Sequence, residues 1–180
     1  GASVKVFDSS LTRLQRLREQ VGDVYTCTLQ PQILAKALRR CDVVIGALRP
    51  VNGRTPVVVT EAMVAAMKPR SVVVDLSIDH GGCLETSEVT SWDAPVYTKF
   101  DVTHFAVPNI ASRVARTASF ALNNLTSPML RELADLGGVE EALRAKPHWR
   151  SGVYLYHGQL TSAPLARSMD QPFTDLDLLL

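Results

Sequence analysis

The chain has 180 residues, a formal net charge of +1 and 46% hydrophobic residues. This length accommodates one large domain with a substantial core, and the near-neutral charge gives no reason to expect a nucleic-acid partner. No uninterrupted apolar run reaches membrane-spanning length, and the three cysteines form no C-x-x-C pair, so we expect no membrane span and a reducing, cytoplasmic location.

Strands and helices alternate over the first 110 residues, a pattern that predicts a parallel sheet with helices on its faces. Segment 81–99 has little periodicity, and we expect it to be irregular. The expected strands span 3–7, 24–29, 41–48, 71–77 and 102–109, and the expected helices span 9–22, 30–40 and 60–70.

The character of the chain changes after Asn109. We expect a long helix over 113–136 that Pro128 interrupts, a second helix over 138–152 and a loop-rich tail. We therefore predict two parts, an α/β domain over 1–110 and a helical C-terminal segment over 111–180.

Asp8 follows the first expected strand and precedes a helix. In a dinucleotide-binding unit, the second strand ends in an acid that binds the adenosine ribose, and a glycine-rich turn precedes that acid by about 20 residues. The sequence contains no such turn. Asp8 is therefore either a helix-capping residue or the ribose acid of a Rossmann-type sheet that lacks its first, central strand.

The stretch "SVVVDLSIDHGG" (71–82) places two carboxylates where a buried strand ends. We expect Asp75 to hold backbone amides of the following loop. Asp79 is either a residue that stabilises the Asp-His-Gly-Gly turn or part of an active site.

The words "CDVVIGAL", "MKPRSVVVDLSIDHGGCLETS", "HFAVPN" and "RTASFALNN" resemble the C-terminal part of the alanine dehydrogenases. This family shares its fold with the alpha subunit of nicotinamide nucleotide transhydrogenase, and the "IDHGG" element favours the dehydrogenase. The resemblance implies an incomplete Rossmann-type parallel sheet, followed by a helical segment that returns to the substrate domain. It also implies the NAD-dependent oxidation of L-alanine, with water, to pyruvate and ammonium.

The resemblance further implies that Asp79 is catalytic and lies beside the nicotinamide. His80 is interpreted as a polar neighbour rather than a base. For Leu48, Leu76 and Val107, a role in the strand core explains the sequence nearly as well as NAD binding does. The implied NAD-binding residues are Asp8, Arg13, Leu48, Arg49, Leu76, Ser77, Ile78, Asp79, Val107, Asn109 and Ile110.

The family's substrate-binding residues lie in an N-terminal segment that this sequence lacks, so we expect the 180 residues alone to be inactive. The resemblance implies a homo-oligomer, in the family a hexamer built from dimers. We expect no metal site, because His157 in "YHGQL" has no second visible ligand. Two alternatives stay open: a transhydrogenase-type NAD-binding subunit, and a non-catalytic remnant whose helix over 113–136 serves oligomer assembly.

Overall fold

The computed structural model describes residues 1–50 and 53–180, which divide into two compact units. The first unit contains Gly1–Leu48 and Pro56–Pro108, and the second contains Arg49–Thr55 and Asn109–Leu180. The assignment of 1–110 to a cofactor domain and of 111–180 to a substrate domain stays a prediction.

The first unit alternates strands and helices, as the sequence pattern predicts. In chain order its elements are β1 (Lys5–Asp8), α1 (Leu11–Val21), β2 (Tyr25–Thr28), α2 (Pro31–Leu38), β3 (Val43–Gly46), α3 (Glu61–Ala65), β4 (Val72–Asp75), the 3₁₀ helix η1 (Ile78–His80), β5 (Val96–Lys99) and β6 (Val102–Phe105).

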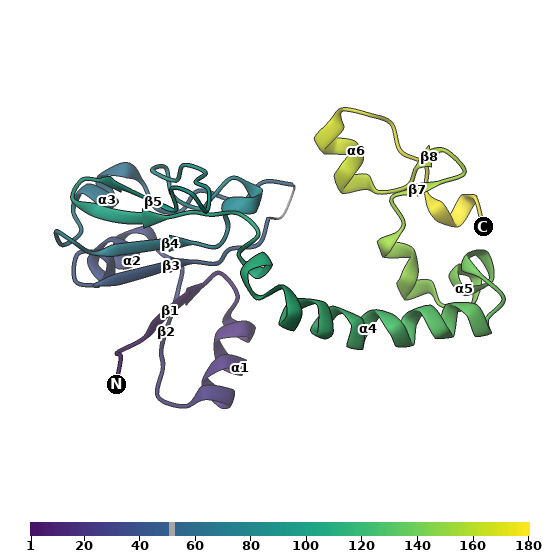
Figure 1. Ribbon diagram of the computed structural model, residues 1–180, viewed down its shortest axis with the longest axis horizontal. Coiled ribbons are helices and arrows are strands. Elements are labelled where there is room, and N and C mark those ends of the chain that lie inside the picture. The colour runs from purple at the N-terminus through teal and green to yellow at the C-terminus, as the bar shows by residue number, and fades with distance from the viewer. Residues whose placement is uncertain (51–52) are drawn as a thin grey trace. The chain divides into compact units, whose positions relative to one another are not determined.

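These strands form two sheets. β1 pairs with β2 in parallel, and a separate four-stranded sheet has the order β3-β4-β6-β5 (Figure 1). Among the described residues no ladder joins β1 to β3. In the Rossmann-type strand order, the strand between these two is the first one, so the break falls where the sequence predicts a missing strand.

The four-stranded sheet is parallel except at its β5 edge. β3, β4 and β6 run in parallel, whereas β5 pairs with β6 antiparallel. Only Phe100 and Asp101 connect β5 to β6, and both adopt positive φ angles. A two-residue connection of this kind joins antiparallel strands. The prediction that all of segment 81–99 is irregular is therefore wrong for Val96–Lys99.

The core of this unit lies where α2 and α3 pack on the four-stranded sheet (Figure 1). Val64 of α3, Val73 of β4 and Val102 of β6 are fully buried, and Phe7 of β1 is a partly buried neighbour of the same cluster. The opposite side of β3 is bare, with Ile45 65% exposed. Through Phe7, the β1–β2 pair contacts the same hydrophobic core as the larger sheet.

The second unit is mostly helical. Its elements are η2 (Ile110–Val114), α4 (Ala115–Asp135), α5 (Val139–Ala145), η3 (Pro147–Gly152), β7 (Leu155–Tyr156), β8 (Gln159–Leu160), α6 (Ala163–Met169) and η4 (Leu176–Leu178). No helix in the described part of the chain is both long and apolar enough to cross a membrane.

One sequence prediction for this unit is wrong. α4 continues through Pro128 without interruption. The exposed helix tolerates the missing N–H because water reaches the unpaired carbonyl group. The tail also holds a hairpin, β7–β8, whose turn residues His157 and Gly158 both have positive φ, and the helix α6.

Candidate functional site

Three parallel strands bring their carboxyl ends to one edge of the four-stranded sheet. The Leu76 amide donates to the Gly46 carbonyl (2.7 Å), and the Leu48 amide donates to Oγ of Ser77 (2.8 Å). The loops that follow β3 and β4 are thus tied together. Val107, two residues beyond the end of β6, follows at the same edge and is 4% exposed.

The residues after β4 form a tight turn that carries Asp79. The Ser77 carbonyl accepts hydrogen bonds from the amides of His80 (3.1 Å) and Gly82 (3.0 Å). Gly81 adopts a left-handed conformation (φ 96°), and Gly82 also has a positive φ of 75°. Glycine is favoured at both positions for this reason. Ser77 and Ile78 are buried, while Asp79 is exposed.

Asp75, the last residue of β4, is 2% exposed and holds backbone amides as the sequence predicts. Its Oδ1 accepts the Ser77 amide and its Oδ2 accepts the Cys83 amide, each at 2.9 Å. The Ser87 hydroxyl also donates to Oδ2, at 2.6 Å. Asp75 therefore supports the turn on which Asp79 lies.

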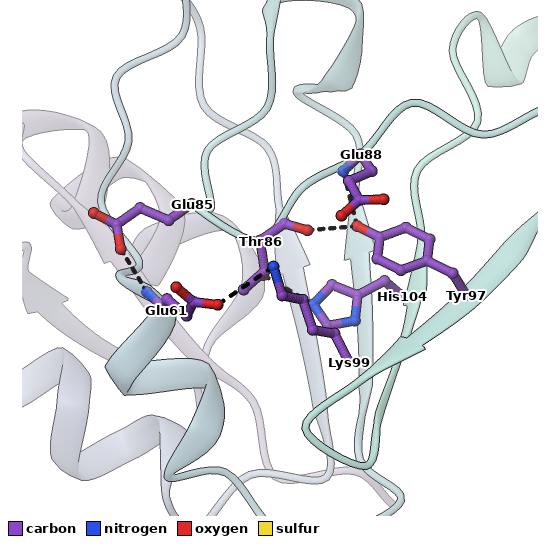
Figure 2. Close-up of polar contacts among 7 residues, drawn as sticks. All are labelled: Glu61, Glu85, Thr86, Glu88, Tyr97, Lys99 and His104. Atoms are coloured by element: carbon purple, nitrogen blue, oxygen red, sulfur yellow. Dashed lines mark hydrogen bonds and ion pairs between the residues drawn. The ribbon is translucent and has the colours of Figure 1, made fainter.

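The segment after the turn is fixed by a buried polar cluster around His104 (Figure 2). Oγ1 of Thr86 lies 3.0 Å from Nε2 of His104, and the Tyr97 hydroxyl donates to the Thr86 carbonyl at 2.7 Å. The Glu88 amide donates to the same hydroxyl, at 2.8 Å. The sequence pattern did not indicate this cluster, because Thr86, Glu88 and Tyr97 lie on segment 81–99, which has little periodicity, and only His104 lies on an expected strand.

The same region connects to the start of α3 (Figure 2). The Glu85 carboxylate accepts the Glu61 amide at 2.6 Å, and Nζ of Lys99 lies 3.3 Å from the Glu61 carboxylate. An acceptor at a helix N-terminus satisfies an otherwise unpaired amide. Hydrogen bonds and an ion pair therefore hold the segment from Cys83 to Lys99 against α3 and β6.

Cys83 packs beside Asp75, with Sγ 3.6 Å from Oδ1. Burial, followed by the charge of Asp75, raises the pKa of the Cys83 thiol to about 12. A thiol with this pKa is not a nucleophile near neutral pH. Cys83 is thus a packing residue at the base of the turn.

Asp8 and Arg13 meet at the end of β1, in the two-stranded sheet. Nη2 of Arg13 lies 3.2 Å from Oδ1 of Asp8, and the Ser10 amide donates to the same oxygen at 2.7 Å. Ser10, rather than Asp8, is the N-cap of α1, since its Oγ accepts the Arg13 amide at 3.4 Å. The helix-capping alternative for Asp8 is therefore wrong.

The predicted cofactor residues do not all belong to one unit. Leu48, Leu76, Ser77, Ile78, Asp79 and Val107 lie at the edge of the four-stranded sheet, whereas Asp8 ends β1 of the two-stranded sheet and Arg13 lies on the following helix α1. The remaining three, Arg49, Asn109 and Ile110, belong to the second unit.

Asn109 precedes η2 in a left-handed conformation, with φ 51° and ψ 50°. Such a conformation is uncommon for a residue other than glycine, although asparagine tolerates it better than most. Asn109 lies four residues after the end of β6 and is the residue immediately before η2. Within the described ranges, no group of three or more His, Cys, Asp or Glu residues is placed to hold a metal ion.

Residues 1–163 match the family model described as "Alanine dehydrogenase/PNT, C-terminal domain". The chain belongs to this family. It is 37% identical over 182 residues to an alanine dehydrogenase from Lysinibacillus sphaericus, an alignment that covers 100% of this chain and 49% of that protein. The chain thus spans about half the length of the curated alanine dehydrogenases it matches.

Solved structures are similar to this chain over most of its length as well. An L-alanine dehydrogenase superposes with a TM-score of 0.83 at 33% identity, covering 94% of this chain and 47% of that one. A transhydrogenase from Sinorhizobium meliloti superposes with a TM-score of 0.66 at 25% identity, covering 91% and 43%. The dehydrogenase is therefore the better match both in sequence and in fold.

Proposed function

We propose that this chain is the NAD-binding half of an L-alanine dehydrogenase. The reaction is the oxidation of L-alanine by NAD, with water, to pyruvate, ammonium and NADH. The observation that carries this proposal is the Asp79 turn, held at the carboxyl edge of a parallel sheet in a chain aligned throughout its length with alanine dehydrogenases. Ligands of open α/β sheets bind at this edge.

Asp8 fits the adenosine ribose of NAD. Both of its contacts, the Ser10 amide and Arg13, are made by Oδ1, and among the described residues Oδ2 has no partner. A carboxylate oxygen of this kind accepts hydrogen bonds from ribose hydroxyls and repels a ribose phosphate. We propose that Asp8 selects NAD over NADP and that Arg13 orients the Asp8 carboxylate.

Asp79 supplies a carboxylate at the reacting end. Oxidation of an amine passes through a cationic imine, which an ionised carboxylate stabilises, and water addition to the imine requires proton transfer. NAD, when bound, supplies the two-electron oxidant. We propose that Asp79 stabilises the imine and moves a proton as the imine, carbinolamine and amine interconvert.

We also propose roles for the remaining predicted cofactor residues. We assign the adenine side to Leu48 and Arg49, and the stretch that runs under the dinucleotide to Leu76, Ser77 and Ile78. Val107, Asn109 and Ile110 are assigned to the nicotinamide end. This assignment rests on the family match and on the common sheet edge of Leu48, Ser77 and Val107.

We further propose that the substrate residues come from the half of the family's proteins that this chain does not span, and that the whole protein is a homo-oligomer, a hexamer built from dimers. Exposed apolar side chains on α4, among them Leu122, Leu125 and Met129, support an assembly role for this helix. A cytoplasmic location is proposed because Cys27, Cys41 and Cys83 form no disulfide.

A transhydrogenase-type subunit is the second candidate, favoured by the superposition with the Sinorhizobium meliloti protein. The two candidates differ in substrate. A full-length protein containing this sequence should form NADH from L-alanine and NAD, while the 180-residue chain alone should not. Hydride exchange between NADH and an NADP analogue, with no turnover of L-alanine or pyruvate, would instead establish the transhydrogenase.

A further inference from the structure

The carboxylate of Asp75 contacts both ends of one turn. It accepts the Ser77 amide, which enters the turn, and the Cys83 amide, which leaves it, each at 2.9 Å. Asp79 lies between these two amides in the sequence. A single buried side chain therefore closes the loop that carries the proposed catalytic carboxylate.

The turn has other anchors besides Asp75. Ile78 is 4% exposed, the Leu48 amide donates to Oγ of Ser77, and the amides of Val58 and Val59 donate to the Cys83 carbonyl. Its internal hydrogen bonds are made by the amides of His80, Gly81 and Gly82 to the carbonyls of Ser77 and Ile78. Two consecutive glycines, Gly81 and Gly82, gain little rigidity from side-chain packing, and glycine is the most flexible residue. Asp75, the last residue of β4, thus holds the backbone amides at both ends of the turn with one side chain.

Two glycines, Gly46 and Gly82, lie close to the Asp75 carboxylate. A Cβ atom added at Gly46 would lie 3.0 Å from Oδ1 of Asp75 and would clash with Sγ of Cys83. A Cβ atom added at Gly82 would lie 2.8 Å from Oδ2 of Asp75 and 2.7 Å from Cβ of Ser87. Cβ atoms do not approach other atoms more closely than about 3 Å, so a side chain at Gly82 would displace Ser87 and the Asp75 carboxylate, and one at Gly46 would displace Sγ of Cys83 and crowd the carboxylate.

We propose that Asp75 is the positioning residue for Asp79, and that Gly46 and Gly82 are small so that the Asp75 carboxylate can hold the Ser77 and Cys83 amides together. The role of Asp79 rests on the proposed function, whereas the closure of the turn does not. Asp75 contacts neither substrate nor cofactor in this account. It acts only through the backbone of 77–83.

Hydrogen exchange of individual amides tests the closure without any substrate. In Asp75→Asn, one carboxylate oxygen becomes an NH₂ group, which cannot accept from an amide. Protection of the Ser77 or Cys83 amide in the 180-residue chain should fall about tenfold or more. Protection of the Thr103 amide, which donates to the Ser71 carbonyl within the sheet, should not change.

Two further variants complete this experiment. Asp42→Asn is the matched control, because it loses only an exposed ion pair with Lys68 and should leave every turn amide protected. Ser87→Ala removes a single donor to Oδ2 and should lower protection at Cys83 by a smaller factor than Asp75→Asn does. Unchanged protection of both turn amides in Asp75→Asn would overturn the proposal. Equal loss throughout the sheet in both Asp75→Asn and Ser87→Ala would overturn it as well.

Turnover in a full-length protein then tests positioning. Turnover per NADH-binding site should fall at least about tenfold in Asp75→Asn. Because Ser77 and Ile78 on the same turn are proposed cofactor residues, turnover is measured at saturating nucleotide so that a change in the dissociation constant does not enter this ratio. Counting NADH sites excludes unfolded molecules, so a purely structural defect would leave this ratio unaltered. Full turnover per site in a variant with an opened turn would contradict the positioning role. If even the wild-type protein does not oxidise alanine, the exchange result still stands by itself.

Discussion

The imidazole of His104 stacks on the ring of Tyr97, with ring centroids 4.9 Å apart, and is only 1% exposed. Nδ1 lies 3.0 Å from the Val102 carbonyl. Because a carbonyl only accepts, Nδ1 carries the proton, and Nε2 of the neutral ring accepts from the Thr86 hydroxyl. The fold thus holds a neutral histidine at the centre of the cluster that anchors the segment after the Asp79 turn.

Burial is the largest influence on the pKa of His104 and lowers it. The hydrogen bond to the Val102 carbonyl opposes this shift, Lys99 adds to it, and Glu88 and Asp75 oppose it less strongly. The unfolded chain therefore takes up a proton near pH 6.5, before the folded chain does. Stability should fall as the pH drops from about 6.5 towards the lower folded pKa. Urea unfolding at about pH 7.5 and about pH 5.5 measures this loss.

The His104→Asn variant should lose part of this pH dependence, whereas His80→Asn, at an exposed position, should retain it. An equal pH dependence of unfolding in the wild type and in His104→Asn would show that other groups cause it.

The Cys83 thiol should resist alkylation in the native chain. With a pKa of about 12, only about one thiol in ten thousand is ionised near pH 8. Iodoacetamide followed by mass spectrometry should therefore modify the partly exposed Cys27 first, and Cys83 only after denaturation. Rapid modification of native Cys83 would mean that the base of the turn opens.

Arg150 should stabilise the second unit. Its Nε donates to the Leu143 carbonyl (2.8 Å), and its Nη1 pairs with Asp177 at 2.8 Å. Arg150→Ala leaves the end of α5 without this donor and should cost about 1–2 kcal/mol of unfolding free energy. Arg144→Ala, which removes an exposed pair with Glu140, is the control and should have no measurable effect. Equal stabilities of the two variants in urea would refute this role for Arg150.

Asp8→Ala in a full-length protein should weaken NAD binding about tenfold, because a charged hydrogen bond to the ribose is worth about 1.5–3 kcal/mol. It should also strengthen NADP binding, because Arg13 would lose its carboxylate partner. Asp23→Ala, an exposed substitution in the same unit, is the control. Fluorescence titration with both nucleotides measures the preference, and an unaltered NAD-to-NADP ratio would remove Asp8 from the ribose site.

The sequence predicted the parts of the fold in which local pattern and burial agree. "SVVVDLS" predicted β4 and the support role of Asp75, since alternate side chains of β4 are buried and the strand ends in a carboxylate. The split between the β1–β2 pair and the larger sheet also followed, from the missing glycine turn before Asp8.

Other features depend on contacts that a local pattern does not contain. β5 has four residues after Pro95, and it exists because β6 offers a free edge. Pro128 predicted a break in α4, yet the helix continues, and Oγ1 of Thr126 bonds to the Leu122 carbonyl just before the proline. Gly46 lies inside an expected strand. A glycine inside a strand can indicate close approach by another group, which at this position is the side chain of Asp75 or Cys83.

Alanine-dependent NADH formation by a full-length protein, measured for the wild type and for Asp79→Asn side by side, tests the central claim most directly. The wild type should turn over, and Asp79→Asn should lose about 10²–10⁴-fold in turnover with nearly unchanged NADH affinity, as expected when a proton-transfer group is removed. His80→Gln, the adjacent polar substitution, should retain wild-type turnover. Equal turnover in the wild type and in Asp79→Asn, or a wild type that does not oxidise L-alanine, would contradict the account.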